Sequence, residues 1–168
     1  MRSIISYPTL FQNLAVMMQT MIADLAIDVV CGVPYGAVPL ATAIALSGKH
    51  PMIMQRKQAK EYGTQKVIEG VFNQGASCLV IEDVITTGSS ILETINLLER
   101  EGLVVRDVIV VIDRQQGGVA YVEKQGYTVH TVCTLSEVLS TLLDADLITD
   151  DQYVIVKRFC DEHTISAW

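Results

Sequence analysis

The chain has 168 residues, of which 50% are hydrophobic, and this is enough to fill one core, so we expect a single domain over residues 1–168. The formal net charge of −7 and the pI near 4.8 argue against a nucleic-acid binder, because such proteins neutralise phosphates with Lys and Arg. No apolar run approaches the roughly 20 residues that cross a bilayer, and no signal-peptide pattern opens the chain. We therefore expect a soluble, cytoplasmic protein without a membrane partner.

Three short apolar runs, at residues 28–33, 78–81 and 108–112, are each followed by Gly, Pro or acidic residues. Continuous rather than alternating hydrophobicity is typical of strands that are covered on both faces, as in a parallel sheet. Between these runs, residues 37–46 have helical spacing, and so do Ile91, Leu92, Ile95 and Leu98. We predict an α/β fold with a doubly wound, mainly parallel sheet that is flanked by helices and binds its ligand at the carboxyl ends of the strands.

Local signals predict where several helices begin and end. Ser6, Tyr7 and Pro8 predict a helix start with Pro near the first position. Ser90 and Glu93 fit a capping box for the helix that contains Ile91, and Gly102 is its expected C-cap. Residues 136–143 and 150–161 are expected to form two surface helices.

Two other groups of residues bear on the chemistry. Residues 55–66 contain Arg56, Lys57, Lys60 and Lys66 in an otherwise acidic chain, with little to bury, and are predicted to form a mobile basic loop. The four cysteines and three histidines are scattered without metal-ligand spacing, so we expect buried thiols and no structural metal.

Residues 80–90 carry the strongest functional signal, an apolar strand followed by Glu82 and Asp83 and then a hydroxyl-and-glycine turn that opens a helix. A helix N-terminus offers unpaired N–H groups and the positive end of the helix dipole, and Gly88 lets the backbone approach an anion. The adjacent acids favour a ligand with ribose hydroxyls or a developing cation. Taken alone, the acid pair is also explained as exposed acids at a strand end, and the hydroxyl-and-glycine turn as a simple capped turn.

A nucleotide-binding P-loop fits less well. Ser47, Gly48 and Lys49 match the end of that motif, but Ala43 stands where its first glycine belongs, so a helix C-cap explains these residues better.

Residues 82–90 resemble the phosphoribosyl-diphosphate signature of type I phosphoribosyltransferases. The resemblance continues in residues 31–37, 56–64, 69–70 and 113–118, and in that order the set is similar to orotate phosphoribosyltransferases. Tyr62 makes the chain similar to the transferase domain of bifunctional uridine monophosphate synthase. The resemblance implies transfer of ribose 5-phosphate from phosphoribosyl diphosphate to orotate, which gives orotidine 5′-monophosphate and diphosphate in pyrimidine (UMP) biosynthesis.

The resemblance also assigns residues. Glu82 and Asp83 would hold the ribose hydroxyls, and Arg56, Lys57 and Lys60 would neutralise the leaving diphosphate, with Lys57, Lys60, Glu82 and Asp83 as the catalytic groups. Thr86 and Arg114 would bind orotate, because a guanidinium fork suits its carboxylate. The full set expected to contact phosphoribosyl diphosphate is Tyr35, Arg56, Lys57, Lys60, Tyr62, Glu82, Asp83, Val84, Ile85, Thr86, Thr87, Gly88, Ser89 and Ser90.

Mg²⁺ is the implied cofactor, held mainly by substrate and water, and a homodimer is the implied assembly. Gly36 departs from the Lys that many bacterial relatives carry, which removes one implied diphosphate contact, and Tyr35 has a simple turn role as its alternative. Relatives also carry an N-terminal hood before the position of Met1, so we expect an N-terminally short domain with weakened orotate binding. Two alternatives stay open: a regulatory or low-activity phosphoribosyl-diphosphate binder, and a purine transferase, which would not need Arg114.

Overall fold

The computed structural model describes residues 2–56 and 67–165 and has a six-stranded sheet in the order β3-β2-β1-β4-β5-β6. Lys57, Lys60 and Tyr62 lie outside the described residues. The strands are β1 (Val29–Gly32), β2 (Met52–Gln55), β3 (Ile68–Glu69), β4 (Ser77–Ile85), β5 (Val104–Asp113) and β6 (Thr128–Thr134). The helices are a 3₁₀ turn η1 (Arg2–Ser6) and α1 (Pro8–Met21), α2 (Val38–Gly48), α3 (Ser89–Arg100), α4 (Gly118–Lys124), α5 (Leu135–Asp144) and α6 (Asp150–Glu162).

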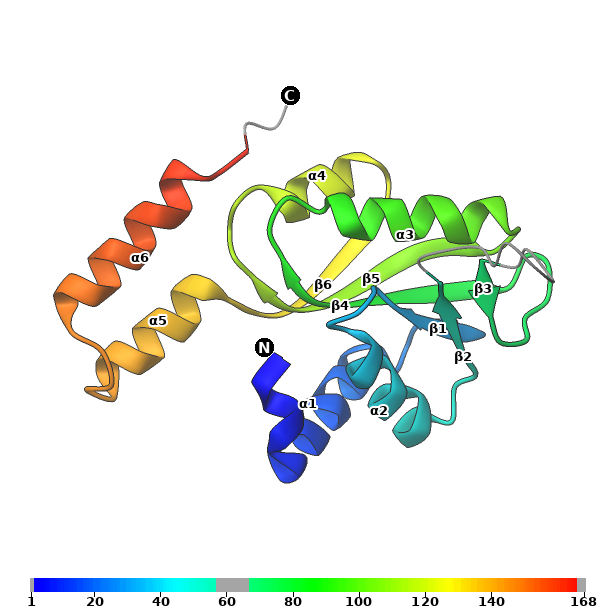
Figure 1. The fold of residues 1–168 in the computed structure, drawn as a ribbon, viewed down its shortest axis with the longest axis horizontal. Coiled ribbons are helices and arrows are strands. Elements are labelled where there is room, and N and C mark those ends of the chain that lie inside the picture. The colour runs from blue at the N-terminus through cyan, green and yellow to red at the C-terminus, as the bar shows by residue number, and fades with distance from the viewer. Residues whose placement is uncertain (1, 57–66, 166–168) are drawn as a thin grey trace.

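The predicted doubly wound fold is confirmed. All neighbouring strands are parallel except β2 and β3, which are antiparallel. Helices α1 and α2 cover one face of the sheet, and α3 and α4 cover the other (Figure 1). The chain runs from β1 outward to β2 and then returns to add β4, β5 and β6 on the other side. The boundary between β1 and β4 is therefore the switch point, where open sheets of this type bind their ligands.

Two apolar cores hold these layers together. On the side of α3, Val80 and Val108 of the sheet pack with Ile91, Ile95 and Leu98, which form the buried stripe of that helix. On the other side, Leu79, Ile81 and Ile109 pack with buried residues of α1 and α2. Because successive strand residues point to opposite faces, a central strand with both faces covered must be apolar throughout, as the sequence predicted.

The observed elements correct some of the predicted boundaries. Helix α1 begins at Pro8 as expected, although no side chain caps it. The capping box expected from Ser90 and Glu93 is wrong, because Gly88 is the N-cap of α3 and no side chain caps that helix either. At its other end Gly102, with φ +88°, follows the C-cap Glu101, and its N–H donates to Glu99.

Helices α5 and α6 were expected one or two residues shorter and begin with true capping boxes. The Thr134 hydroxyl accepts from the Glu137 N–H, and the Glu137 carboxylate accepts from the Thr134 N–H. The same reciprocal pattern joins Thr149 and Gln152 at the start of α6. The two helices extend from the end of β6 beyond the sheet (Figure 1).

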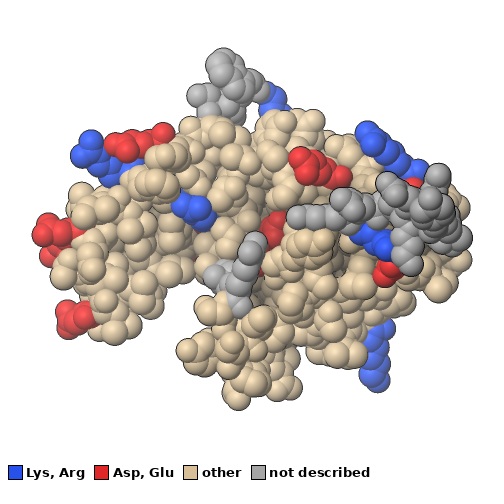
Figure 2. Space-filling model, in the orientation of Figure 1, with Lys and Arg blue, Asp and Glu red and all other residues tan. Residues whose placement is uncertain are grey.

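The surface divides by charge. Helix α1 contains no charged residue, and the surface over it carries none in Figure 2, whereas acidic side chains gather around α5 and α6.

Three cysteines, Cys31, Cys78 and Cys160, are buried as predicted, and Cys133 is half-buried. Among the residues that the structure describes, no helix is long and apolar enough to span a membrane.

Candidate functional site

Three turns meet at the carboxyl edge of the sheet, beside the switch point. They follow β1, β4 and β5, and strand register places them together, since Gly32 pairs with Ile81 and Ile85 pairs with Asp113. Residues 33–37, 86–88 and 114–117 therefore lie at one edge. This is the edge at which the sequence predicted the ligand.

The turn after β4 has the geometry expected for an anion site. Gly88 has φ +79° and precedes the first turn of α3, whose N–H groups no side chain caps. The hydroxyls of Thr87 and Ser89 are hydrogen-bonded to each other at 3.1 Å. A Cβ on Gly88 would lie 2.7 Å from Val122, so both the left-handed backbone and the packing require glycine there.

Glu82 lies beneath this turn with only 5% of its surface exposed. Its Oε1 accepts from the Asp83 N–H at 2.9 Å, and its Oε2 accepts from the Ser90 hydroxyl at 3.3 Å. Burial, first of all, and then the side-chain interaction with the Asp83 carboxyl raise the pKa of the Glu82 carboxyl from 4.5 to about 8, against the opposing effect of the hydrogen bond from the Asp83 backbone N–H. The buried site therefore favours the protonated form of Glu82.

Asp83 is partly exposed and faces the turn after β1. A Cβ on Gly36 would lie 2.7 Å from Asp83 Oδ2, so the carboxyl group occupies the space that a side chain at position 36 would need. A side chain at position 36 would therefore push the Asp83 carboxyl aside. Tyr35, beside it, is 60% exposed, and the Pro34–Tyr35 peptide bond is cis.

The turn after β5 places Arg114 beside Thr86. The Arg114 N–H donates to the Ile85 carbonyl at 3.1 Å, and a Cβ on Gly118 would clash with the Thr86 carbonyl. The structure thus brings together the two residues that were predicted to bind orotate. The sequence analysis included Gly118 in the motif at residues 113–118 but gave it no role. Its missing side chain permits this close approach, and two consecutive glycines at the start of a helix were a usable signal.

Of the predicted basic loop, the described part is its first two residues. Arg56 forms an ion pair with Glu69 at 2.8 Å, and its N–H donates to Val67. The Thr94 hydroxyl donates to the Gln55 side chain at 3.1 Å, which anchors the end of β2 to α3. Within residues 2–56 and 67–165, no group of three or more His, Cys, Asp or Glu side chains could hold a metal ion.

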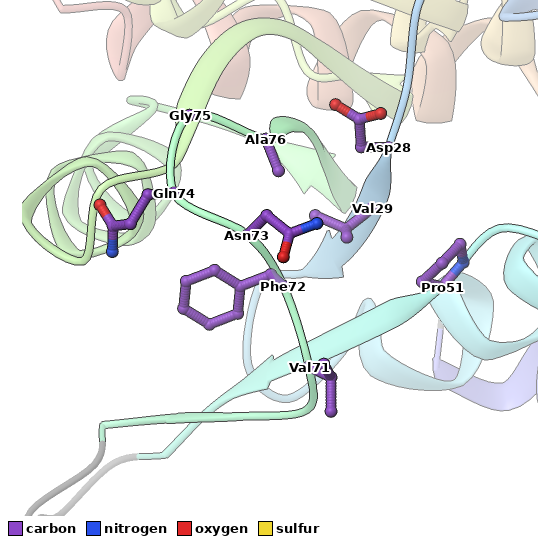
Figure 3. Close-up of a pocket in the computed structure, with 9 residues that line it drawn as sticks. All are labelled: Asp28, Val29, Pro51, Val71, Phe72, Asn73, Gln74, Gly75 and Ala76. Atoms are coloured by element: carbon purple, nitrogen blue, oxygen red, sulfur yellow. The ribbon is translucent and has the colours of Figure 1, made fainter.

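A second hollow lies at the opposite edge of the sheet, where the strands begin (Figure 3). It is lined by Asp28, Val29, Pro51 and residues 71–76. The carboxylate of Asp28 already accepts from the Ser77 N–H at 2.8 Å. This hollow has no other charged side chain, and it offers none of the groups that meet at the carboxyl edge.

Comparison with known proteins agrees with this arrangement. Residues 3–134 match the family described as "Phosphoribosyl transferase domain". The orotate phosphoribosyltransferase of Chlamydia felis is 41% identical over 145 residues, which cover 85% of this chain and 70% of that protein. The chain belongs to the orotate phosphoribosyltransferase family.

Longer family members are similar too. The uridine 5′-monophosphate synthase of Bos taurus is 44% identical over 99% of this chain, but the chain spans only 35% of that protein's length. Among solved structures, Leishmania donovani UMP synthase matches 96% of the chain and 35% of its own length, at 30% identity and a TM-score of 0.87. The Mycobacterium tuberculosis orotate phosphoribosyltransferase in complex with phosphoribosyl diphosphate matches 76% of the chain and 74% of its own, at 31% identity and a TM-score of 0.68.

Proposed function

We propose that this chain is an orotate phosphoribosyltransferase, which transfers ribose 5-phosphate from phosphoribosyl diphosphate to orotate and releases diphosphate. The observation that carries the proposal is the meeting of three features at one edge: the uncapped turn at Gly88, the acids Glu82 and Asp83, and Arg114 tethered to Ile85. Relatives that bear this name and a neighbour solved with phosphoribosyl diphosphate support it.

The turn after β4 is proposed to hold the 5′-phosphate. Residues 84–90 surround an N-terminus whose free N–H groups and dipole favour an anion. The partly exposed carboxyl of Asp83 would accept from a ribose hydroxyl directly. Protonated Glu82, which is buried behind it, would donate to a second hydroxyl or ionise when a cation approaches.

The diphosphate would lie over the turn at Tyr35 and Gly36, with Arg56, Lys57, Lys60 and Tyr62 as its side-chain contacts. Cations there neutralise the charge that grows on the leaving group, which is worth most when water is excluded. The residues fit Mg²⁺ held mainly by substrate and water, because the partly exposed carboxylate of Asp83 could join the substrate oxygens as a ligand. Bound Mg²⁺ would supply further neutralisation of the diphosphate.

Orotate would contact Arg114 and Thr86. A guanidinium can pair with the orotate carboxylate through two parallel hydrogen bonds. The backbone hydrogen bond from Arg114 to Ile85 places the start of this side chain beside the phosphate turn. A purine has no carboxylate for this pair. Arg114 therefore favours orotate over a purine substrate and an enzyme over a regulatory binder of phosphoribosyl diphosphate.

The proposal includes one domain, a cytoplasmic place in pyrimidine (UMP) biosynthesis and a homodimer. Support for the dimer comes from α1, where Leu10, Val16, Met17 and Met21 are exposed on a helix without charge. The assembly is tested by sedimentation, with Met17→Glu expected to give monomers and Asn96→Glu, at an exposed position of α3 on the other face of the sheet, as the control. Retention of the dimer in Met17→Glu, or a monomeric unaltered chain, would count against it.

The decisive test of the reaction is orotate consumption, followed by absorbance with phosphoribosyl diphosphate and Mg²⁺, together with calorimetry of each ligand. Asp83→Asn should lower turnover by orders of magnitude, and Arg114→Ala should raise the KM for orotate with little change in binding of phosphoribosyl diphosphate. Arg106→Ala, which changes an exposed arginine of β5, the strand that precedes Arg114, is the matched control. Tight binding of phosphoribosyl diphosphate without any orotate turnover would refute the enzyme and favour the regulatory binder.

A further inference from the structure

The end of α6 packs against the turn that carries Arg114. The Ile165 N–H donates to the Gln116 carbonyl at 3.0 Å, and the buried Gln116 amide donates to the His163 carbonyl at 3.5 Å. Gly117 has φ +92°, and a Cβ there would lie 2.8 Å from the Ile165 carbonyl. Residues far apart in the sequence thus form one closely packed contact.

An aromatic ring of α6 reaches Arg114 itself. The guanidinium carbon of Arg114 lies 5.9 Å from the centre of the Phe159 ring, within the range of a cation–π contact. Phe159 in turn stacks on His163 with ring centres 4.0 Å apart and an interplanar angle of 25°. The ring is therefore held by its own helix and is not a freely rotating surface side chain.

A second contact joins the same turn to α5. The Gln115 side chain accepts hydrogen bonds from the N–H and the hydroxyl of Ser136, and the Lys157 ammonium donates to that hydroxyl at 3.1 Å. The Gln115 N–H donates to Asp113 at 2.7 Å. The turn after β5 is thus held by β4 on one side and by both C-terminal helices on the other.

These helices lie outside the segment that defines the phosphoribosyltransferase domain, since the family match ends at residue 134. The similarity to Leishmania UMP synthase nevertheless covers 96% of the chain. A segment beyond the matched domain thus contacts Arg114, the residue that is assigned to the carboxylate of the base. Its described contacts with the site fall on the turn after β5, at residues 114–117.

We propose that Phe159 is a positioning residue for Arg114, and that α6 thereby tunes the use of orotate separately from the use of phosphoribosyl diphosphate. This inference rests on the proposed function. An arginine side chain has many rotamers, and orienting it costs free energy on every binding event. The Phe159 ring restricts these rotamers before orotate arrives, so the unaltered protein should bind the base more tightly than a protein without the ring.

The test uses the full chain and compares Phe159→Ala, Phe159→Tyr and the control Val154→Ala, which changes an exposed residue of the same helix. Phe159→Ala should raise the KM for orotate about fivefold. Its KM for phosphoribosyl diphosphate and the calorimetric affinity for that ligand should not change. Phe159→Tyr, which keeps an aromatic face, should restore the orotate KM, and Val154→Ala should leave both values unchanged.

A double-mutant cycle with Arg114→Ala identifies the route of the effect. If Phe159 acts through Arg114, its removal should have no further effect on the orotate KM once Arg114 is alanine. An unchanged orotate KM in Phe159→Ala, or equal losses for both substrates with a lower unfolding temperature, would overturn the inference and leave the proposed function standing. No orotate turnover by the unaltered chain would overturn both.

Discussion

Replacing Glu82 by Gln should make the protein's stability less dependent on pH. Glu82 is 5% exposed, and burial raises its pKa from 4.5 to about 8. Between these two values the folded protein holds a proton that the unfolded chain has released. The free energy of unfolding therefore falls as the pH rises from about 4.5 to about 8 and is level above that range.

The size of the effect follows from the pKa values. A rise from 4.5 to about 8, at about 1.4 kcal/mol for each pKa unit, costs the folded protein up to about 5 kcal/mol at high pH. Glutamine has nearly the same shape and no charge to bury, and its oxygen can still accept from the Asp83 N–H. We expect the free energy of unfolding of Glu82→Gln to rise relative to that of the unaltered protein between pH 5 and pH 9. The difference should approach this limit at high pH.

Urea unfolding at pH 5, 7 and 9, followed by circular dichroism, measures the difference directly. Asp83→Asn is the second variant, because the side-chain hydrogen bond with the Asp83 carboxyl and its charge are further causes of the raised pKa. This change should reduce the pH dependence without abolishing it, since burial is the larger cause. If the unaltered protein and Glu82→Gln keep a constant difference within about 0.5 kcal/mol from pH 5 to pH 9, Glu82 is not a buried proton carrier and the reasoning is wrong.

Three further predictions test the packing around the site. Gly36→Ala should weaken binding of phosphoribosyl diphosphate about tenfold in calorimetry, because its Cβ would lie 2.7 Å from Asp83 Oδ2. In an Asp83→Ala background the same change should have no further effect, and an additive loss there would contradict the proposed contact. Gly102→Ala should lower the unfolding free energy by about 1–2 kcal/mol, because φ is +88°, while ligand binding stays the same; unchanged stability would contradict the strained turn. Glu69→Ala should lower the unfolding free energy by less than about 1 kcal/mol, because its ion pair with Arg56 is only half-buried. Arg56→Ala should instead raise the KM for phosphoribosyl diphosphate, and an equal rise in both variants would mean that the ion pair matters and the Arg56 charge alone does not.

Sequence patterns were sufficient for the elements whose signals are local. The apolar runs predicted the central strands because a doubly covered strand has no polar face, and Pro8 and Gly102 marked helix ends through their backbone preferences. The same kind of pattern failed at Ser90. A serine followed by an acid three residues later predicts a capping box, but the Ser90 hydroxyl donates to Glu82 instead.

Part of the candidate site could also be predicted from local sequence, and part could not. The phosphate turn and its two acids were readable because all their residues lie within one short segment, and the family resemblance added Arg114 from the turn after β5. The true capping boxes at Thr134 and Thr149 were also present in the sequence as a hydroxyl followed three residues later by Glu or Gln. Both have the same spacing as the Ser90 pattern, and only the fold distinguished them.

The sequence alone determined the doubly wound sheet and the edge at which the ligand should bind, because hydrophobic period and turn chemistry act over a few residues. Only the tertiary structure decided that Glu82 is buried in a site that favours its protonated form, that Gly36 makes room for Asp83, and that Phe159 lies over Arg114. These properties depend on desolvation and close packing between segments that are distant in the sequence. No local pattern encodes them, because the partner of each residue is set by how the strands and helices come together.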